Sequence, residues 1–246
     1  WTTGMGFYSD NDKLNAILRD IDFDSYKRDT TGTDIYIMGF ISFSDFSAEA
    51  KKYVLLNFLV SIWKGNLSVI INGEKISREN LQKYVWELND QESKDIHDLK
   101  EYYDLLIKPD SEVKVIHLQA EEYGKDYGFL DDECELRLKE GKGLNSRILL
   151  TRQSGMRLFE QDRISGSIDF TGVLLMNGVH MNEAFRKLEV PSHDAWAPDR
   201  LKNPIEKKKA EKMLSDFRKY LRNCVKDTFG HTDEVQINAF GMAEFL

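Results

Sequence analysis

The pattern of apolar positions along the chain predicts two long helices. Behind Ser47, a residue type that caps helix N-termini, apolar side chains recur at helical spacing until Gly65 ends the segment. This first stripe comprises Val54, Leu55, Phe58, Leu59, Ile62 and Trp63. The sequence Asn203-Pro204-Ile205-Glu206 is typical of a capped helix start and opens a second helix to about Lys226. Its stripe comprises Met213, Leu214, Phe217, Tyr220, Leu221, Cys224 and Val225.

Shorter patterns fill the rest of the chain. Helices are predicted over 12–21, 78–88, 94–107 and 182–188. Strands are predicted over 34–41, 66–71, 75–76, 112–120, 133–139, 145–152, 155–160 and 167–176. Asn72-Gly73 and Ser154-Gly155 have the residue types of tight hairpin turns. Because strands cluster in the middle with helices around them, we expect an α+β fold, a mixed sheet with helices packed on one face and a C-terminal helix.

Composition narrows the class of protein. The chain has 246 residues, of which 41% are hydrophobic, enough for one large or two modest cores. Its longest apolar run, 53–63, is much shorter than the roughly 20 residues that span a bilayer. The two cysteines, Cys134 and Cys224, lack metal-site spacing and are too few for a disulfide framework. We therefore expect a cytoplasmic protein without a membrane segment.

Charge is distributed unevenly. The formal net charge is −8, yet residues 200–226 hold ten Lys and Arg against three acids, a net +7, so the remainder sums to about −15. Such a basic helix is either an ordinary solvated face or a surface for nucleic acid or an acidic partner. The candidate contacts are Lys207, Lys208, Lys209, Lys212, Arg218, Lys219 and Arg222.

Two glycine motifs near the start have the chemistry of phosphate binding. Gly32-Thr33 is predicted to form a turn that leads into the apolar segment 34–41, and Gly4-Met5-Gly6-Phe7 lies upstream. Glycine lets a backbone approach a phosphate closely, and backbone N–H groups at a helix N-terminus bind it.

These motifs resemble those of the GHKL ATPases, the superfamily of gyrase, Hsp90, histidine kinases and MutL. Segments 145–159, 170–174, 182–189 and 191–196 are similar to the region after the ATPase domain in bacterial GHKL-type proteins, many of them associated with phage defence or DNA-processing gene clusters. The resemblance implies the end of an ATP-binding domain over 1–45, an S5-like transducer domain over 46–200, and a C-terminal helix and tail over 201–246.

The resemblance also implies roles for particular residues. Gly4, Gly6, Gly32 and Thr33 would close the nucleotide site. A transducer of this family donates a Lys or Gln to the γ-phosphate, so hydrolysis changes the angle between domains. The first candidates for this contact are Arg152 and Gln153 in a predicted hairpin, and the second is Lys142 between two glycines.

The chain departs from the family in one important respect. The catalytic glutamate and the asparagine and aspartate motifs that bind Mg²⁺ and adenine are not found in it. We expect these residues to lie upstream of Trp1, so that ATP and Mg²⁺ bind only when the upstream half is present. The resemblance further implies a homodimer that acts on DNA or on a partner effector protein.

Two functions outside the ATPase class also fit the sequence. One is a non-enzymatic interaction module that docks nucleic acid or an acidic partner through the basic C-terminal helix. The other is a nuclease-like effector, for which Glu135 and Lys139 only loosely match the expected spacing of an acid and a lysine.

One further segment has two interpretations. His193-Asp194 between two prolines has the residue types of a base and its orienting acid. The structural interpretation is that Trp196 packs this loop onto the sheet, while His193 or Asp194 caps neighbouring backbone. The acidic segment 131–135 likewise fits either a cation site or a solvated strand end.

Overall fold

The computed structural model describes residues 31, 35, 41, 45–89 and 93–230. The chain divides into two units, Trp1–Phe43 and Ser44–Leu246, and the described helices and strands all belong to the second. Gly4, Gly6, Gly32 and Thr33 lie outside the described residues. So does the predicted helix over 12–21.

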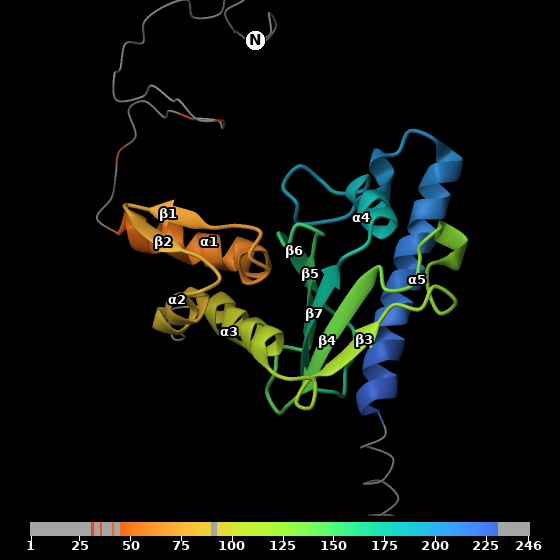
Figure 1. Cartoon of the computed structure of the whole chain (residues 1–246). Helices are drawn as coiled ribbons and strands as arrows, with labels where there is room; N and C mark the ends of the chain where they lie inside the picture. Colours follow the sequence, from red (N-terminus) through yellow and green to blue (C-terminus); the bar gives the residue numbers. More distant parts are fainter. Residues whose placement is uncertain (1–30, 32–34, 36–40, 42–44, 90–92, 231–246) are drawn as a thin grey trace, which may run out of the picture. The chain divides into compact units, whose positions relative to one another are not determined.

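The second unit is built on a five-stranded mixed sheet (Figure 1). Its order is β3-β4-β7-β5-β6, and β5 and β7 run parallel while the other neighbours are antiparallel. The strands are β3 (Lys114–His117), β4 (Cys134–Glu140), β5 (Arg147–Thr151), β6 (Arg157–Gln161) and β7 (Phe170–Met176). The α+β class and the mixed sheet predicted from the sequence are confirmed.

The central strand β7 explains why the sheet is covered on both faces. All seven of its residues are buried, and they alternate between two apolar cores. Leu174 and Met176 face one core, whereas Val173 and Leu175 face the other. At Gly172 the neighbouring strands approach so closely that an added Cβ would lie 2.9 Å from Leu138 and 3.0 Å from Ile148.

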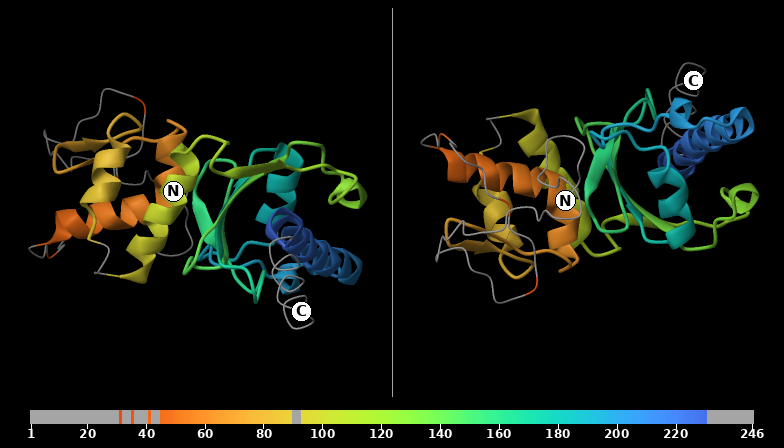
Figure 2. Two further views of the ribbon diagram at one scale, coloured as in Figure 1. Left: turned by 90° about the horizontal axis from the view of Figure 1, so that it is seen from below. Right: turned by 90° about the horizontal axis from the view of Figure 1, so that it is seen from above.

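Helices from both ends of the second unit supply this cover. Figure 2 shows the sheet between α1, α2 and α3 on one side and α4 and α5 on the other. The prediction that helices pack on one face was therefore wrong, because a strand that is apolar on both faces needs cover on both. The helices are α1 (Phe46–Trp63), α2 (Leu81–Glu87), α3 (Lys94–Ile107), α4 (Val179–Arg186) and α5 (Pro204–Phe229).

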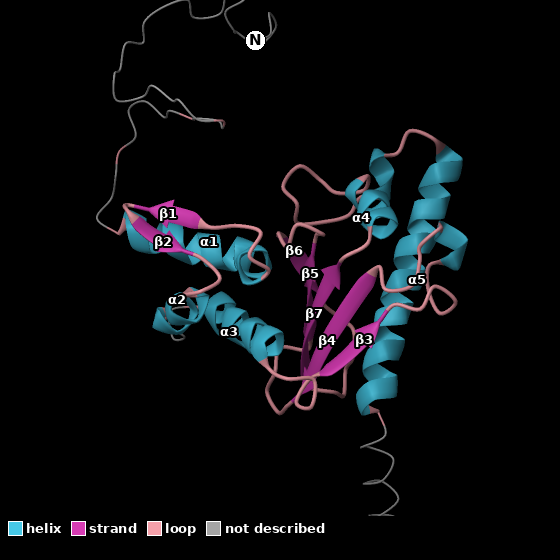
Figure 3. Ribbon diagram, in the orientation of Figure 1, coloured by secondary structure: helices cyan, strands magenta, loops and turns pink. Residues whose placement is uncertain are grey.

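The smaller elements complete the unit (Figure 3). A hairpin of β1 (Val69–Ile71) and β2 (Glu74–Ile76) turns at Asn72 and Gly73, whose φ angles are 48° and 83°. This confirms the predicted turn. Two short 3-10 helices, η2 (Lys125–Tyr127) and η3 (Pro198–Arg200), lie in the connections.

Candidate functional site

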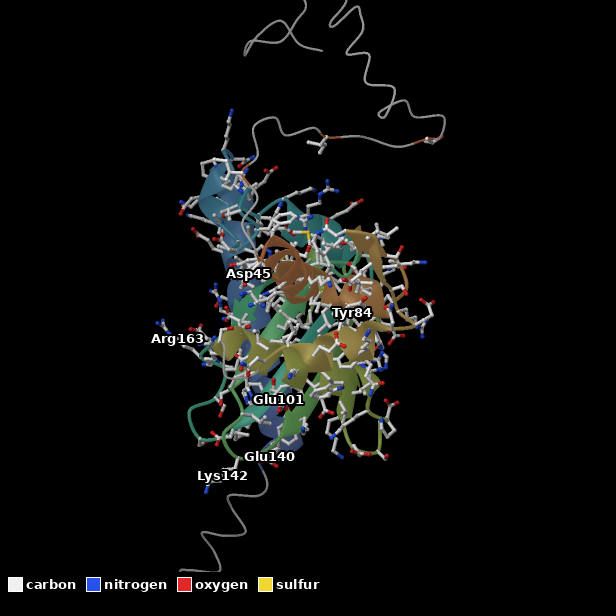
Figure 4. All side chains as sticks on the ribbon, turned by 90° about the vertical axis from the view of Figure 1, so that its left-hand side faces the viewer. Asp45, Tyr84, Glu101, Glu140, Lys142 and Arg163 are labelled. Carbon is white, nitrogen blue, oxygen red and sulfur yellow. The ribbon has the colours of Figure 1, made fainter. Side chains whose placement is uncertain are left out.

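The three described candidates for the γ-phosphate contact lie at opposite ends of the sheet. Lys142 is in the turn that connects β4 to β5, whereas Arg152 and Gln153 are in the β5–β6 hairpin. The five residues of β5 separate these two loops by about 16 Å. Figure 4 shows Lys142 beside Glu140 at the lower end of the sheet. These residues therefore do not form one site, and each loop has to be considered separately.

Arg152 is already engaged within the domain. Its Nε donates to Oε1 of Glu189 at 3.0 Å, and its Nη2 pairs with the second carboxylate oxygen. His193 Nδ1 lies 2.9 Å from that nitrogen and 3.2 Å from Glu189 Oε2. Glu189 is buried, so breaking this bidentate pair leaves a charge without its partner in a poorly solvated position. The Arg152–Glu189–His193 cluster fixes the hairpin to the loop after α4.

Gln153, the next residue of the hairpin, also contacts the segment around α4. Its backbone N–H donates to Asn182 Oδ1 at 3.2 Å, and its Nε2 donates to the Asn177 carbonyl at 2.9 Å. Lys64 reaches the same region and donates to Asn177 Oδ1 at 2.9 Å. Burial lowers the pKa of Lys64, an effect that Glu135 opposes. The Gln153 side chain is exposed, and its one hydrogen bond to a described residue is the one to the Asn177 carbonyl.

Glu133 organises the start of α4 at this end of the sheet. Its buried carboxylate accepts the backbone N–H groups of His180 and Met181 at 3.0 and 2.9 Å and lies 2.7 Å from His180 Nδ1. A carboxylate at a helix N-terminus satisfies donors that have no partner within the helix. Glu133 is thus a structural cap, which the sequence did not indicate because its helix begins 46 residues later.

Lys142 differs from Arg152 and Gln153. Its side chain is exposed, and it has no hydrogen bond or ion pair with any described residue. The turn that carries it is held by Gly143, which has a φ of 81° and whose N–H donates to Asp169 Oδ2 at 2.8 Å. Among the three described candidates for the γ-phosphate contact, Lys142 is therefore the one whose side chain has no contact to give up.

A second polar cluster lies between α3 and the edge of the sheet. Asp98 is 2% exposed, and its Oδ2 has no hydrogen-bond partner among the described residues. Glu160 lies close by and is held by Arg147 and Arg157 at 2.7 and 2.9 Å. Burial is the main cause that raises the pKa of Asp98, and the charge of Glu160 adds to it.

We expect Asp98→Asn to increase the free energy of unfolding at pH 7. The raised pKa means that the folded state disfavours the charged carboxylate, so wild-type stability falls as the pH rises above the ordinary pKa of about 4. The gain from Asn should be small at about pH 3 and should grow towards neutral pH. Urea unfolding at several pH values measures it. A gain that does not vary with pH would contradict this assignment.

The basic candidates on α5 differ in how far they are engaged by other described residues. Lys207 pairs with Asp199, and Lys212 pairs with Asp216 at 2.6 Å, so these cations are partly neutralised. Arg222 Nε donates to the Arg163 carbonyl at 3.3 Å. The remaining candidates are exposed and form no ion pair with another described residue: Lys208, Lys209, Arg218 and Lys219.

The loop around His193 has a structural role. Trp196 is buried and packs against Phe185 and Phe159, with ring centroids 4.4 and 4.8 Å apart, as the structural interpretation predicted. The predicted backbone cap is not what the structure shows. His193 contacts the side chains of Arg152 and Glu189, and Asp194 accepts from the Ser192 hydroxyl.

Neither a metal site nor a membrane-spanning helix is found among the described residues. Across the described ranges no three His, Cys, Asp or Glu side chains come together in a way that would hold a metal ion. None of the helices in these ranges is long and apolar enough to cross a membrane. In comparisons of the chain with protein-family models, curated proteins and solved structures, nothing matches.

Proposed function

We propose that this chain is the nucleotide-sensing transducer portion of a GHKL-type ATPase, with Lys142 as the side chain that contacts the γ-phosphate. The observation that carries the proposal is the exposed Lys142 on a turn held by the Gly143–Asp169 hydrogen bond. A sensor of this kind needs a cation that no carboxylate already neutralises, on a backbone that does not have to be ordered when the phosphate arrives.

The contacts of the three candidate side chains support the choice of Lys142 for this role. Arg152 would have to leave Glu189, which is buried, before it reached a phosphate. The Gln153 side chain would give up the hydrogen bond that its Nε2 donates to the Asn177 carbonyl. Lys142 would lose no contact with a described residue. This reverses the order in which sequence patterns placed these residues.

The proposal is tested on the full reading frame that encodes this chain. A non-hydrolysable ATP analogue with Mg²⁺ should increase dimerisation over ADP by about fivefold or more, the lower range of typical coupling between sites. Lys142→Ala should abolish the difference between the analogue and ADP while both nucleotides still bind. Analytical ultracentrifugation measures the dimer, and calorimetry measures nucleotide binding.

Lys114→Ala is the matched control, since Lys114 is another exposed lysine on the same sheet. It should leave the nucleotide effect unchanged. Failure of the full-length protein to bind the analogue would overturn the proposal as a whole. An unchanged nucleotide effect in Lys142→Ala would overturn only the assignment of Lys142.

A further inference from the structure

Five cations lie in one row along the outside of α5, with one gap between Lys212 and Lys219. They are Lys208, Lys212, Lys219, Arg222 and Lys226, and all five are exposed. At 3.6 residues per turn their spacings of 4, 7, 3 and 4 residues confine them to an arc of about 80°. At 1.5 Å per residue the line is about 27 Å long. We call these five residues the basic stripe.

The fold displays the basic stripe rigidly. The opposite side of α5 packs into the core beneath the sheet through nine buried residues, among them Phe217 and Leu221. Figure 1 shows α5 lying along the sheet, on the face that also carries α4. The stripe therefore points away from the sheet, and its cations need no ordering of the backbone before they bind a ligand.

Most of the stripe is not neutralised locally. Lys208, Lys219 and Lys226 form no ion pair with a described residue, whereas Lys212 is paired with Asp216. Like charges three and four residues apart on a helix repel each other, so the arrangement is unfavourable without an anionic partner. Between Lys212 and Lys219 the stripe has one position without a cation, where the uncharged Ser215 lies.

The end of the stripe adjoins a pocket with a mixed lining, to which Ile164 and Ile168 contribute apolar side chains. Arg222 and Lys226 line a space of about 290 Å³ together with Ser165, Ser167 and Asn223. Arg222 also holds the carbonyl of Arg163, an exposed cation that Figure 4 shows pointing outwards. Guanidinium, ammonium and hydroxyl donors around one small space have the chemistry that binds a phosphate oxygen.

These features distinguish nucleic acid from other polyanions. A helix that lies in a membrane surface needs an exposed apolar face, but the apolar face of α5 is buried in the core. Stacking of single-stranded bases needs exposed aromatic rings, and Phe217 and Tyr220 are buried. A 27 Å length of duplex carries about 16 phosphate charges, whereas an extended acidic peptide of that length has only about eight residues.

We propose that the basic stripe binds the phosphate backbone of duplex nucleic acid without sequence preference. The stripe makes contacts to phosphates only, which fix position but carry no sequence information. The residues outside 200–226 sum to about −15, so the rest of the chain repels the duplex and directs it to α5. This binding does not depend on nucleotide or on the proposed transducer role.

The test is fluorescence anisotropy of the full chain with a labelled 30-base-pair DNA duplex of arbitrary sequence, at salt concentrations from 50 to 200 mM and without nucleotide. The triple variant Lys208→Gln, Lys219→Gln and Lys226→Gln removes cations that have no described ion pair. Its affinity should fall about tenfold or more at 50 mM salt. The slope of log K against log salt should decrease by about 2.7, which corresponds to three lost phosphate contacts.

A second triple variant, Lys75→Gln, Lys83→Gln and Lys114→Gln, makes the same change in net charge on other elements. It should bind the duplex like the wild type. Equal weakening in both variants would overturn the proposal, because net charge alone would then explain binding. So would the absence of duplex binding at 50 mM salt, or tighter binding to vesicles with 30% phosphatidylserine or to polyglutamate than to DNA.

Discussion

Gly155→Ala should lower the free energy of unfolding by about 2–5 kcal/mol. Gly155 has a φ of 85°, which costs an L-residue about 1–2 kcal/mol. An added Cβ would also lie 2.5 Å from the Ser61 nitrogen and 2.7 Å from its Cα, both backbone atoms of α1. The β5–β6 hairpin would then have to move away from α1, with loss of the 2.6 Å hydrogen bond from Ser61 Oγ to the Ser154 carbonyl. Urea unfolding measures the effect.

Gly143→Ala separates the cost of the positive φ angle from the cost of steric overlap with α1. Gly143 has a similar φ of 81°, but no atom lies within 4 Å of its added Cβ. This variant should lose only the conformational part, about 1–2 kcal/mol. Equal losses at the two glycines would contradict the assignment of close packing between the hairpin and α1. The comparison is also of functional interest, because Gly143 belongs to the turn that carries Lys142.

Phe217→Ala should lower the free energy of unfolding by about 3–5 kcal/mol, the usual range for a buried phenylalanine. Phe217 is fully buried on α5. Its ring centroid lies 5.0 Å from Phe185, 5.5 Å from Tyr123 and 5.8 Å from Trp196. Truncation would leave a cavity where α4, α5 and the 120–127 loop meet, and these rigid aromatic neighbours are poorly able to fill it.

Ile205→Ala on the same helix is the control for this effect. Ile205 is 79% exposed, so its truncation should change stability by no more than about 0.5 kcal/mol. A small loss in Phe217→Ala would mean that α5 contributes little to the core. The basic stripe would then not be held rigidly, and the argument for its binding to duplex DNA would lose its structural basis.

Local sequence patterns determined many of the elements. Apolar spacing predicted α3 and α5 because each of these helices is amphipathic. It also predicted α1, although burial there extends over the four consecutive residues 59–62 and so is not confined to one side. The Asn72-Gly73 turn followed from the need for positive φ at both positions. The sequence also predicted that Trp196 is buried, because burial of a large aromatic ring is strongly favourable. The boundary of α4 was less accurate: it begins at Val179, three residues before the predicted start.

Tertiary structure decided what these elements do together. It placed helices on both faces of the sheet and put Lys142 and Arg152 at opposite ends of β5. It also paired Arg152 with Glu189, 37 residues further along the chain, a contact that no local pattern indicates. On α5 the sequence showed an excess of positive charge, but burial of the opposite side selected which cations point outwards. Periodicity depends on neighbours within one or two turns and is therefore readable from the chain, whereas ion pairs and sheet order depend on contacts between distant segments that form only when the chain folds.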